Sequence, residues 1–265
     1  MVQGARGASQ ANLSFHADLA EALAGVDFVQ ENGPERIELK QQLYGQLDAL
    51  LPPDVIIASS SSGLPMSQIQ VGAVSYPERC IIGHPFNPPH LIPLVELVAG
   101  AKTSADAIAR ADEFYTAIGR RTVRLNKEMP GHVANRLQGA LAREVYYLVS
   151  EGVLSAADVD TALSWGPGLR WALMGNMMLN HLGGGPGGIE HFFEQFAGPM
   201  THSWKSLGTP ELTPEVQRTL IDSVHEEVGS RTIEDLEAER DTLLLGLLEL
   251  RANAQAIASP DAKAA

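Results

Sequence analysis

The sequence predicts an α/β protein in which an incomplete Rossmann-type, doubly wound sheet is followed by an all-α C-terminal domain. Two observations support this fold class. Short apolar runs alternate with helical patterns over the first 127 residues, which is typical of a parallel sheet covered by helices. From about Glu128 onward, apolar residues recur at helical spacing only. We therefore expect two domains, residues 1–127 and residues 128–265.

The expected elements of the first domain follow one another regularly. Asp18 is a good N-cap for a short helix, and Pro34 suits the first position of a longer one. The core-facing side of that longer helix is expected to consist of Ile37, Leu39, Leu43, Leu47 and Leu50. Strands are expected at residues 13–16, 26–31, 55–58, 80–83, 94–98 and 122–125, with a capped helix at residues 104–119.

The second domain is expected to contain helices alone. Ser155 and Asp158 form a capping signature, and the final helix is expected at residues 233–256. The core positions of the first long helix are Val133, Leu137, Leu141, Val145, Leu148 and Val149, and Met174, Met177 and Met178 are expected to fill the core further on. Residues 183–188 are rich in glycine, but no apolar strand precedes them, so we interpret them as an interhelical loop and not as a phosphate-binding loop.

A histidine and a glutamate stand at the centre of the first domain. His84 ends the apolar run at residues 80–83, and Glu96 lies within a second apolar run, on the same face as Leu94 and Val98. A lone histidine at a strand end is more often structural than catalytic. An unpaired buried carboxylate is costly, however, so Glu96 needs a partner, and His84 is the obvious candidate.

A serine-rich loop offers a second candidate site. Residues 59–63 follow the expected strand at residues 55–58, and parallel sheets hold ligands just past the carboxyl ends of their strands. The same loop could equally be a solvated turn. Its position alone does not separate these two interpretations.

Composition argues against several classes of function. The formal net charge of -13 argues against nucleic acid or an anionic membrane as a partner. Cys80 is the only cysteine, which excludes an internal disulfide and favours a reducing compartment such as the cytoplasm. Its apolar neighbours favour a buried hydrophobe over a nucleophile. The first residues lack the apolar core of a signal peptide, and no segment approaches the roughly eighteen apolar residues of a membrane span.

Several stretches carry a resemblance to a known family. They are residues 28–31 with Pro34 and Glu35, residues 57–64, residues 83–98, residues 130–137 and residues 166–171. Through them the chain resembles the 3-hydroxyacyl-CoA dehydrogenase superfamily, and within it the L-gulonate 3-dehydrogenase (lambda-crystallin) and L-carnitine dehydrogenase branches. The resemblance extends from about Leu13 to about Arg251.

The resemblance implies a catalytic site and a reaction. The family's catalytic histidine and glutamate fall on His84 and Glu96, and its active-site serine and asparagine fall on Ser62 and Asn135. The implied reaction is NAD-dependent oxidation of the 3-hydroxyl group of a small 3-hydroxy acid or of a 3-hydroxyacyl thioester, without a metal. His84 would remove the hydroxyl proton, Glu96 would orient the imidazole, and the other two would bind the substrate oxygen.

Three further residues are candidates for binding. The family's contacts to the nicotinamide cofactor fall on Glu35 and Lys40. Arg170 is followed by Trp171, and a guanidinium can bind a free carboxylate through two parallel hydrogen bonds. We hypothesise that Arg170 holds the carboxylate of a small 3-hydroxy acid. The alternative is a helix-start arginine in a surface or interdomain ion pair.

The Gly-rich dinucleotide fingerprint expected after the family's first strand is missing. Residues 4–7 do not replace it, because no apolar strand leads into them. The strand containing Phe28 and Val29 would then be an edge strand. Either the recorded start is wrong or cut, or the missing half is supplied in trans, or this is a short form without redox activity. The retained catalytic residues favour the first explanation.

Two alternatives to the dehydrogenase remain open at this stage. One is a non-catalytic binding or structural protein, because the cofactor-binding loop is missing and lambda-crystallin resembles this scaffold. The other is a proton transfer or hydration without cofactor, which no residue favours. The apolar helical domain predicts a homodimer, and the sequence does not distinguish NAD from NADP.

Overall fold

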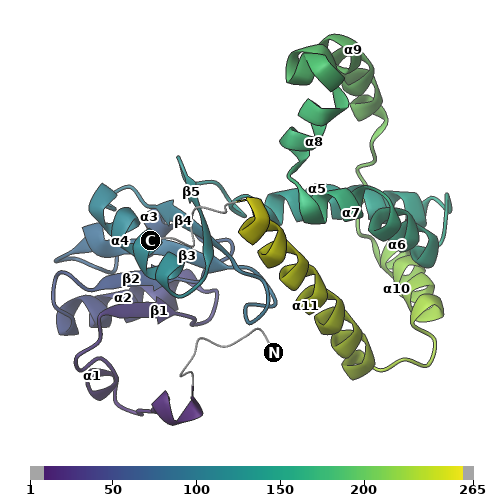
Figure 1. The fold of residues 1–265 in the computed structure, drawn as a ribbon. Coiled ribbons are helices and arrows are strands. Elements are labelled where there is room, and N and C mark those ends of the chain that lie inside the picture. The colour runs from purple at the N-terminus through teal and green to yellow at the C-terminus, as the bar shows by residue number, and fades with distance from the viewer. Residues whose placement is uncertain (1–8, 259–265) are drawn as a thin grey trace. The chain divides into compact units, whose positions relative to one another are not determined.

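The computed structural model describes residues 9–258, and these form two compact units (Figure 1). The division falls between Leu137 and Gln138, ten residues after position 127. We call the part before it the sheet unit and the part after it the helical unit. The boundary lies within helix α5 (Ala134–Ser150), so this helix begins in the sheet unit and continues in the helical unit.

The sheet unit is built on a five-stranded sheet with the strand order β1-β2-β3-β4-β5. Its strands are β1 (Phe28–Glu31), β2 (Ile56–Ser59), β3 (Cys80–Pro85), β4 (Leu94–Ala99) and β5 (Arg121–Leu125). The first three strands are parallel, and β5 is parallel to β4. In the described residues β1 pairs with β2 alone, so it is the edge strand that the sequence predicts.

The expectation of a wholly parallel sheet is wrong at one place, because β4 runs antiparallel to β3. Only residues 86–93 connect these two strands. A parallel crossover needs about a dozen residues or more, so the chain turns directly back. The turn contains a cis peptide bond between Asn87 and Pro88.

Helices cover both faces of the sheet. They are α1 (Leu19–Ala22), α2 (Ile37–Leu50), α3 (Met66–Ile69) and α4 (Ala105–Ala117), with short 3-10 turns η1 (Gln10–Asn12) and η2 (Pro77–Arg79). Ile57 and Ile82 pack on one face with residues of α2 and α3, whereas Ile56 and Ile81 pack on the other with residues of α4. Alternate residues of one strand thus enter two cores, which confirms the doubly wound arrangement.

Several local expectations are confirmed, and others are wrong. The Asp18 carboxylate accepts the Glu21 backbone N–H as the cap of α1, and Ser104 caps α4 in the same way. Helix α2 begins at Ile37 and not at Pro34. Residues 13–16 form no strand. The buried face of α2 is also rotated from the expected one, because Leu39 and Leu50 are exposed and the buried residues are Lys40, Tyr44, Leu47 and Asp48.

The helical unit continues from α5 through six further helices in the described residues. These are α6 (Ala156–Trp165), α7 (Pro167–Leu173), α8 (Asn176–Gly183), α9 (Gly188–Ser203), α10 (Pro214–Val228) and α11 (Ile233–Ala258), with η3 (Gly185–Gly187) and η4 (Trp204–Ser206). The Ser155 hydroxyl accepts the Asp158 backbone N–H, which confirms that cap. The glycine-rich segment connects α8 to α9, as expected.

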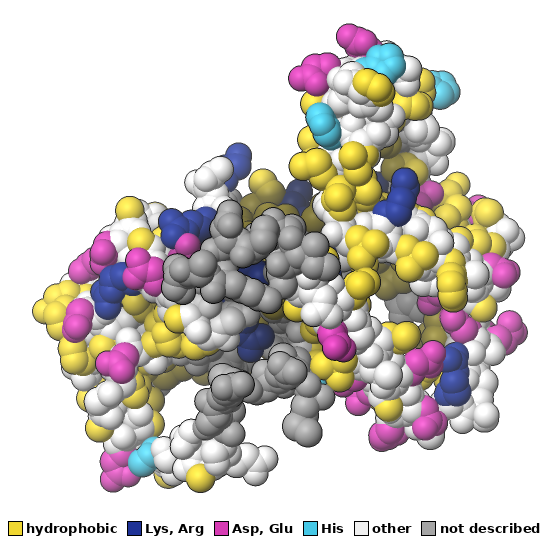
Figure 2. All heavy atoms as spheres, in the orientation of Figure 1, with side chains coloured by type: hydrophobic (Ala, Val, Ile, Leu, Met, Phe, Trp, Pro, Cys, Tyr) yellow, Lys and Arg dark blue, Asp and Glu magenta, His cyan; other side chains and the backbone are white. Residues whose placement is uncertain are grey.

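Many large apolar side chains of the helical unit are exposed (Figure 2). The prediction that the three methionines fill a core is wrong, because Met174, Met177 and Met178 are between 39% and 64% exposed. Leu243 of α11 is also exposed. Monomeric proteins rarely leave large apolar patches uncovered, so this surface is a candidate interface. Over residues 9–258, no helix is both long and apolar enough to cross a membrane.

Candidate active site

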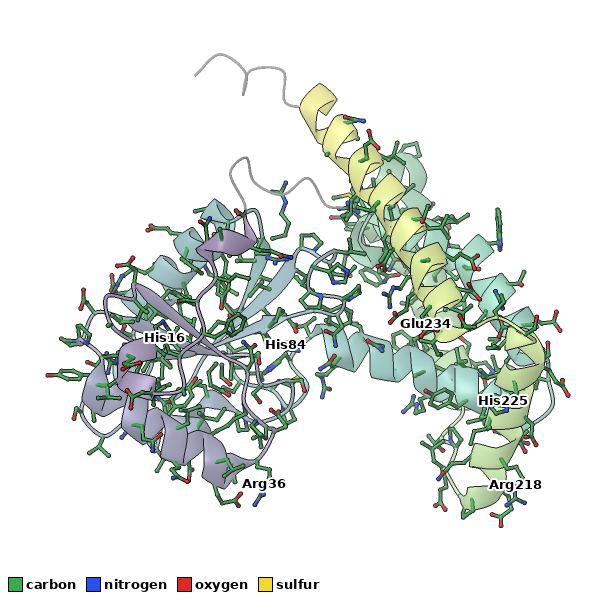
Figure 3. The ribbon with its side chains drawn as sticks, turned by 90° about the horizontal axis from the view of Figure 1, so that it is seen from below. His16, Arg36, His84, Arg218, His225 and Glu234 are labelled. Carbon is green, nitrogen blue, oxygen red and sulfur yellow. The ribbon has the colours of Figure 1, made fainter. Side chains whose placement is uncertain are left out.

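His84 and Glu96 are direct neighbours across the antiparallel pair β3–β4. The His84 Nδ1 atom lies 2.8 Å from Glu96 Oε2, and His84 lies in the sheet unit as labelled in Figure 3. Glu96 is fully buried, and His84 is 6% exposed. A carboxylate only accepts hydrogen bonds, so Nδ1 carries the proton and Nε2 keeps a free lone pair in the neutral ring. This is the protonation pattern of a general base.

The second carboxylate oxygen of Glu96 holds the start of α5. Glu96 Oε1 accepts the backbone N–H groups of Val133, at 2.8 Å, and Ala134, at 2.9 Å. Burial by itself would raise the pKa of Glu96. The hydrogen bonds from His84, Ala134 and Val133 outweigh that effect and lower the pKa. Glu96 is therefore ionised at neutral pH while it is bound to both elements.

Ser62 and Asn135, the two residues expected to bind the substrate oxygen, lie close together. The Asn135 side-chain amide is 3.5 Å from the Ser62 backbone carbonyl. Ser62 is exposed at the end of the loop that follows β2, and Asn135 is the second residue of α5. Asn135 thus lies next to Ser62, in the same helix turn whose backbone N–H groups bind Glu96.

His132 is a residue of this site that the sequence reasoning did not single out. Its ring centroid lies 5.1 Å from that of His84, and its Nε2 atom lies 2.9 Å from the Ser61 carbonyl oxygen. The sequence shows it only as one letter of the segment at residues 130–137. No composition or periodicity signal places a residue so far along the chain against His84.

Lys40 is buried in an ion pair that the sequence did not reveal. Its Nζ atom lies 2.9 Å from both carboxylate oxygens of Glu31, and both side chains are 1% exposed. Glu31 also accepts the Ser59 hydroxyl, at 2.7 Å. Lys40 is therefore buried in its pair with Glu31, and its contact with the cofactor stays a prediction.

Glu35 connects the start of α2 to the serine loop. Its Oε1 accepts the Ser61 hydroxyl at 2.6 Å and the backbone N–H groups of Gly63 and Leu64. Burial opposes ionisation, but these hydrogen bonds prevail and lower the pKa of Glu35. Its side chain remains 43% exposed, 3.8 Å from Lys40 Nζ.

The residues at the carboxyl ends of β1 and β2 fit one part of a nicotinamide cofactor site. This is the edge at which doubly wound sheets bind dinucleotides. Glu35 and Ser62 are among the exposed polar residues there, together with Asn32 and Arg36. Within residues 9–258 no strand is followed by a Gly-x-Gly-x-x-Gly pattern, so the described residues fit the nicotinamide end and not the pyrophosphate.

Two further residues discussed from the sequence are Arg170, in the helical unit, and Cys80, on β3. Arg170 is exposed on α7. Within residues 9–258 its guanidinium makes no hydrogen bond or ion pair, so the alternative of a structural ion pair has no partner among these residues. Cys80 is fully buried, and burial raises the pKa of its thiol to about 12. Cys80 is therefore the inert buried residue that the sequence predicts.

Comparison with known proteins places this site in a family. The NAD-binding domain model of 3-hydroxyacyl-CoA dehydrogenase matches residues 2–129, and the C-terminal domain model matches residues 131–212. The chain belongs to this family. L-carnitine dehydrogenase from Streptomyces coelicolor is 45% identical over 89% of the chain and 74% of the relative. L-carnitine dehydrogenase from a Pseudomonas species is 44% identical over 92% of the chain and 76% of the relative.

A solved structure of the family supports the same fold. The NAD-dependent 5-formyl-3-hydroxy-2-methylpyridine 4-carboxylic acid 5-dehydrogenase is similar with a TM-score of 0.74 and 31% identity, over 89% of this chain and 76% of that one. The expected family, fold, NAD cofactor and oxidoreductase class are confirmed. Nothing in these comparisons supports the alternative of a non-catalytic binding protein.

Proposed function

We propose that the chain oxidises the 3-hydroxyl group of a small, carnitine-like 3-hydroxy acid to the 3-oxo acid, with reduction of NAD. The observation that carries the proposal is the 2.8 Å contact between His84 Nδ1 and a fully buried Glu96 carboxylate. It leaves Nε2 of His84 as the accepting atom. The similarity to L-carnitine dehydrogenases supports the choice of substrate class.

Each side chain of the site has a separate role in the proposed reaction. His84 Nε2 accepts the hydroxyl proton, and the Glu96 carboxylate stabilises the imidazolium that forms. Ser62 and Asn135 donate hydrogen bonds to the oxygen that becomes the carbonyl. NAD, when bound, supplies the acceptor for the hydride that leaves C3. Glu35 is the exposed carboxylate that would hold the nicotinamide end, and Lys40 would keep Glu31 and Glu35 in place.

The direct test measures NADH formation with L-carnitine, L-gulonate and a 3-hydroxyacyl-CoA ester. We expect turnover with L-carnitine, and loss of at least a hundredfold in kcat for His84→Gln, because general acid–base catalysis contributes about 10²–10⁴-fold. His16→Gln is the matched control, since His16 is exposed on the same unit and its polar partners among the described residues are Ser14 and Glu21. Turnover that survives His84→Gln would refute the role of His84.

For Arg170 we propose a role in holding the substrate carboxylate. Its guanidinium is exposed and has no polar partner within residues 9–258, which is consistent with a ligand as its partner. Arg170→Leu should raise KM about tenfold or more, the value of roughly one charge-assisted hydrogen bond. Arg218, exposed on α10 (Figure 3), provides the control Arg218→Leu. An unchanged KM for Arg170→Leu would refute this role.

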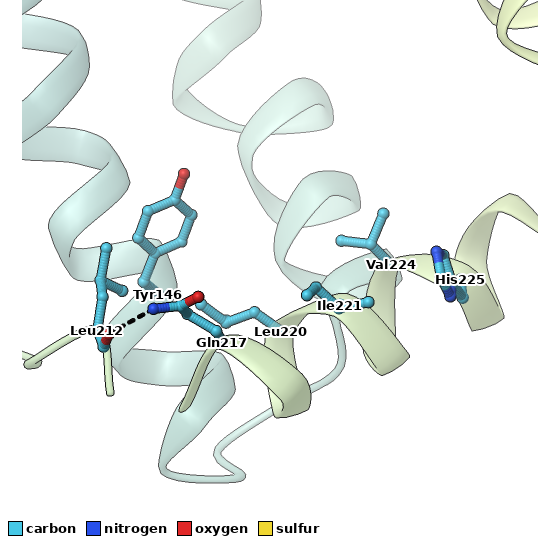
Figure 4. Close-up of a pocket in the computed structure, with 7 residues that line it drawn as sticks. All are labelled: Tyr146, Leu212, Gln217, Leu220, Ile221, Val224 and His225. Atoms are coloured by element: carbon cyan, nitrogen blue, oxygen red, sulfur yellow. Dashed lines mark hydrogen bonds between the residues drawn. The ribbon is translucent and has the colours of Figure 1, made fainter. Parts of the chain in front are cut away.

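We further propose a homodimer formed through the helical unit. Helix α10 and Tyr146 of α5 line an open apolar pocket of about 380 Å³, with Leu220, Ile221 and Val224 along it (Figure 4). Light scattering should give the mass of two chains. Ile221→Glu should give a monomer, whereas Thr219→Glu on the same helix should not. A monomeric parent protein would contradict the proposal.

Cytoplasmic localisation is also a proposal. It rests on Cys80, a single, buried and unpaired thiol. Cell fractionation with a marker for each compartment tests it.

A further inference from the structure

His132 has an unusual combination of burial, backbone conformation and unmet hydrogen bonding. It is 2% exposed, and its φ of 50° is the only positive value of a non-glycine residue in residues 9–258. Its Nδ1 atom is buried and has no hydrogen-bond partner among these residues. A left-handed backbone and a buried, unmet nitrogen each cost free energy. If the ring only filled space, phenylalanine would serve equally well without the cost of a buried nitrogen that has no partner.

The other ring nitrogen of His132 explains why an imidazole is useful there. Nε2 lies 2.9 Å from the Ser61 carbonyl oxygen, which can only accept, so Nε2 carries the proton. Ser61 directly precedes Ser62, and its hydroxyl donates to Glu35. The hydrogen bond from His132 thus joins those to Glu35 in holding the loop that carries Ser62.

The left-handed turn at His132 also directs the next three residues at the site. The N–H groups of Val133 and Ala134 reach Glu96 Oε1, and the Asn135 amide reaches the Ser62 carbonyl. The His132 ring itself lies 5.1 Å from the His84 ring. The loop after β2, the base on β3 and the acid on β4 are therefore all contacted by residues 132–135.

We propose that His132 is a positioning residue that, through its Nε2–H donor, fixes Ser62 against the His84–Glu96 pair. The proposal rests on the proposed function for the roles of Ser62 and His84. It assigns His132 no contact with the substrate. Its essential group is the Nε2–H donor, and its ring shape is secondary.

Two substitutions separate the donor from the shape. His132→Phe keeps the ring and removes the donor, whereas His132→Gln places an amide N–H near the position of Nε2 and removes the ring. A donor role predicts that the Gln variant is closer to the parent protein. A space-filling role predicts the opposite order. His16→Gln, at an exposed histidine of the same unit, controls for the loss of a histidine.

Amide hydrogen exchange and histidine ring NMR provide readouts that do not need turnover. The N–H groups of Gly63 and Leu64, bound to Glu35, should exchange about tenfold faster in His132→Phe, the equivalent of one lost hydrogen bond. The His84 Nδ1–H signal should broaden in the same variant. His132→Gln should restore both. Parent-like signals in His132→Phe with disturbed signals in His132→Gln would overturn the proposal.

A measurement on the parent protein covers the case in which a variant fails to fold. Nitrogen-15 NMR of the full chain should show a proton on Nε2 of His132. A ring that carries its proton on Nδ1 alone would refute the proposal. If L-carnitine is not oxidised while these signals behave as expected, the substrate assignment fails and the role of His132 in ordering the loop stands. If it is oxidised, His132→Phe should lower kcat more than it changes KM.

Discussion

Replacing Glu96 by glutamine should reverse the tautomer of His84. In the parent protein Glu96 Oε2 accepts the Nδ1 proton, at 2.8 Å. The glutamine carbonyl would keep the two backbone N–H groups of Val133 and Ala134, which leaves its amide to face His84. An amide N–H donates, so His84 would carry its proton on Nε2 and lose the lone pair that accepts the substrate proton.

The expected magnitudes follow from the three hydrogen bonds. A hydrogen bond to a charged group contributes about 1.5–3 kcal/mol and a neutral one about 0.5–1.5, so three weakened bonds cost about 3 kcal/mol in the free energy of unfolding. Relief from burying a charge offsets part of this, and we expect a loss of about 2 kcal/mol. The turnover number should fall on the order of 10⁴-fold, the effect of a wrong tautomer in a comparable triad.

The pH dependence of stability gives a second signature of Glu96. Its pKa is lowered in the folded chain, so its contribution is fully present above the unfolded value, near 4.3, and is lost as pH falls through the folded value. Glu96→Gln removes that contribution at every pH. The difference in melting temperature between the parent protein and the variant should therefore shrink as the pH falls below about 4.

Glu128→Gln is a matched control for Glu96→Gln. Glu128 also accepts a backbone N–H, that of Ser67, at 2.7 Å, but it makes no hydrogen bond to His84. It should cost stability and leave the His84 tautomer unchanged. A proton on Nδ1 of His84 in Glu96→Gln, seen by ring NMR, would contradict the expected tautomer, as would more than a tenth of the parental turnover in that variant.

Three further predictions concern the scaffold of the site. Lys40→Met should lower the free energy of unfolding in urea by about 3–5 kcal/mol, because Glu31 would remain buried without its cation, and adding Glu31→Gln should recover part of the loss. Gly83→Ala should cost about 1–3 kcal/mol, since a Cβ there overlaps the Tyr115 hydroxyl, and Tyr115→Phe should relieve some of it; an unchanged melting temperature would contradict this. Cys80 should resist alkylation at pH 8 until the chain unfolds, because its thiol has a pKa of about 12; rapid labelling of the folded chain would disprove its burial.

The His84–Glu96 contact was predictable from the sequence because burial of a carboxylate leaves few choices. An acid between Leu94 and Val98 must find a partner, and His84 ends the preceding apolar run. Helix caps at Asp18 and Ser104 were predictable for a similar reason, since they depend on residues only three positions away.

Contacts between distant segments were not predictable in the same way. The Glu31–Lys40 pair was missed because Glu31 stands at a strand end, where a solvated acid is ordinary. The buried face of α2 differs from the predicted one because Lys40 occupies a core position, where a helical apolar pattern predicts leucine. His132 was missed because a left-handed turn brings it to Ser61, and a local pattern does not show a contact across 71 positions.

The antiparallel turn between β3 and β4 is what allows twelve residues to separate a base from its acid. Paired positions in these strands run from Ile81 with Ala99 to Pro85 with Val95, which sets His84 opposite Glu96. Opposed side chains of an antiparallel pair lie on the same face, whereas a slip of one residue would move Glu96 to the other face. There it could reach neither His84 nor the start of α5. The register of one short strand pair thus determines the tautomer of the base, and Glu96 extends that control to the helix that carries Asn135.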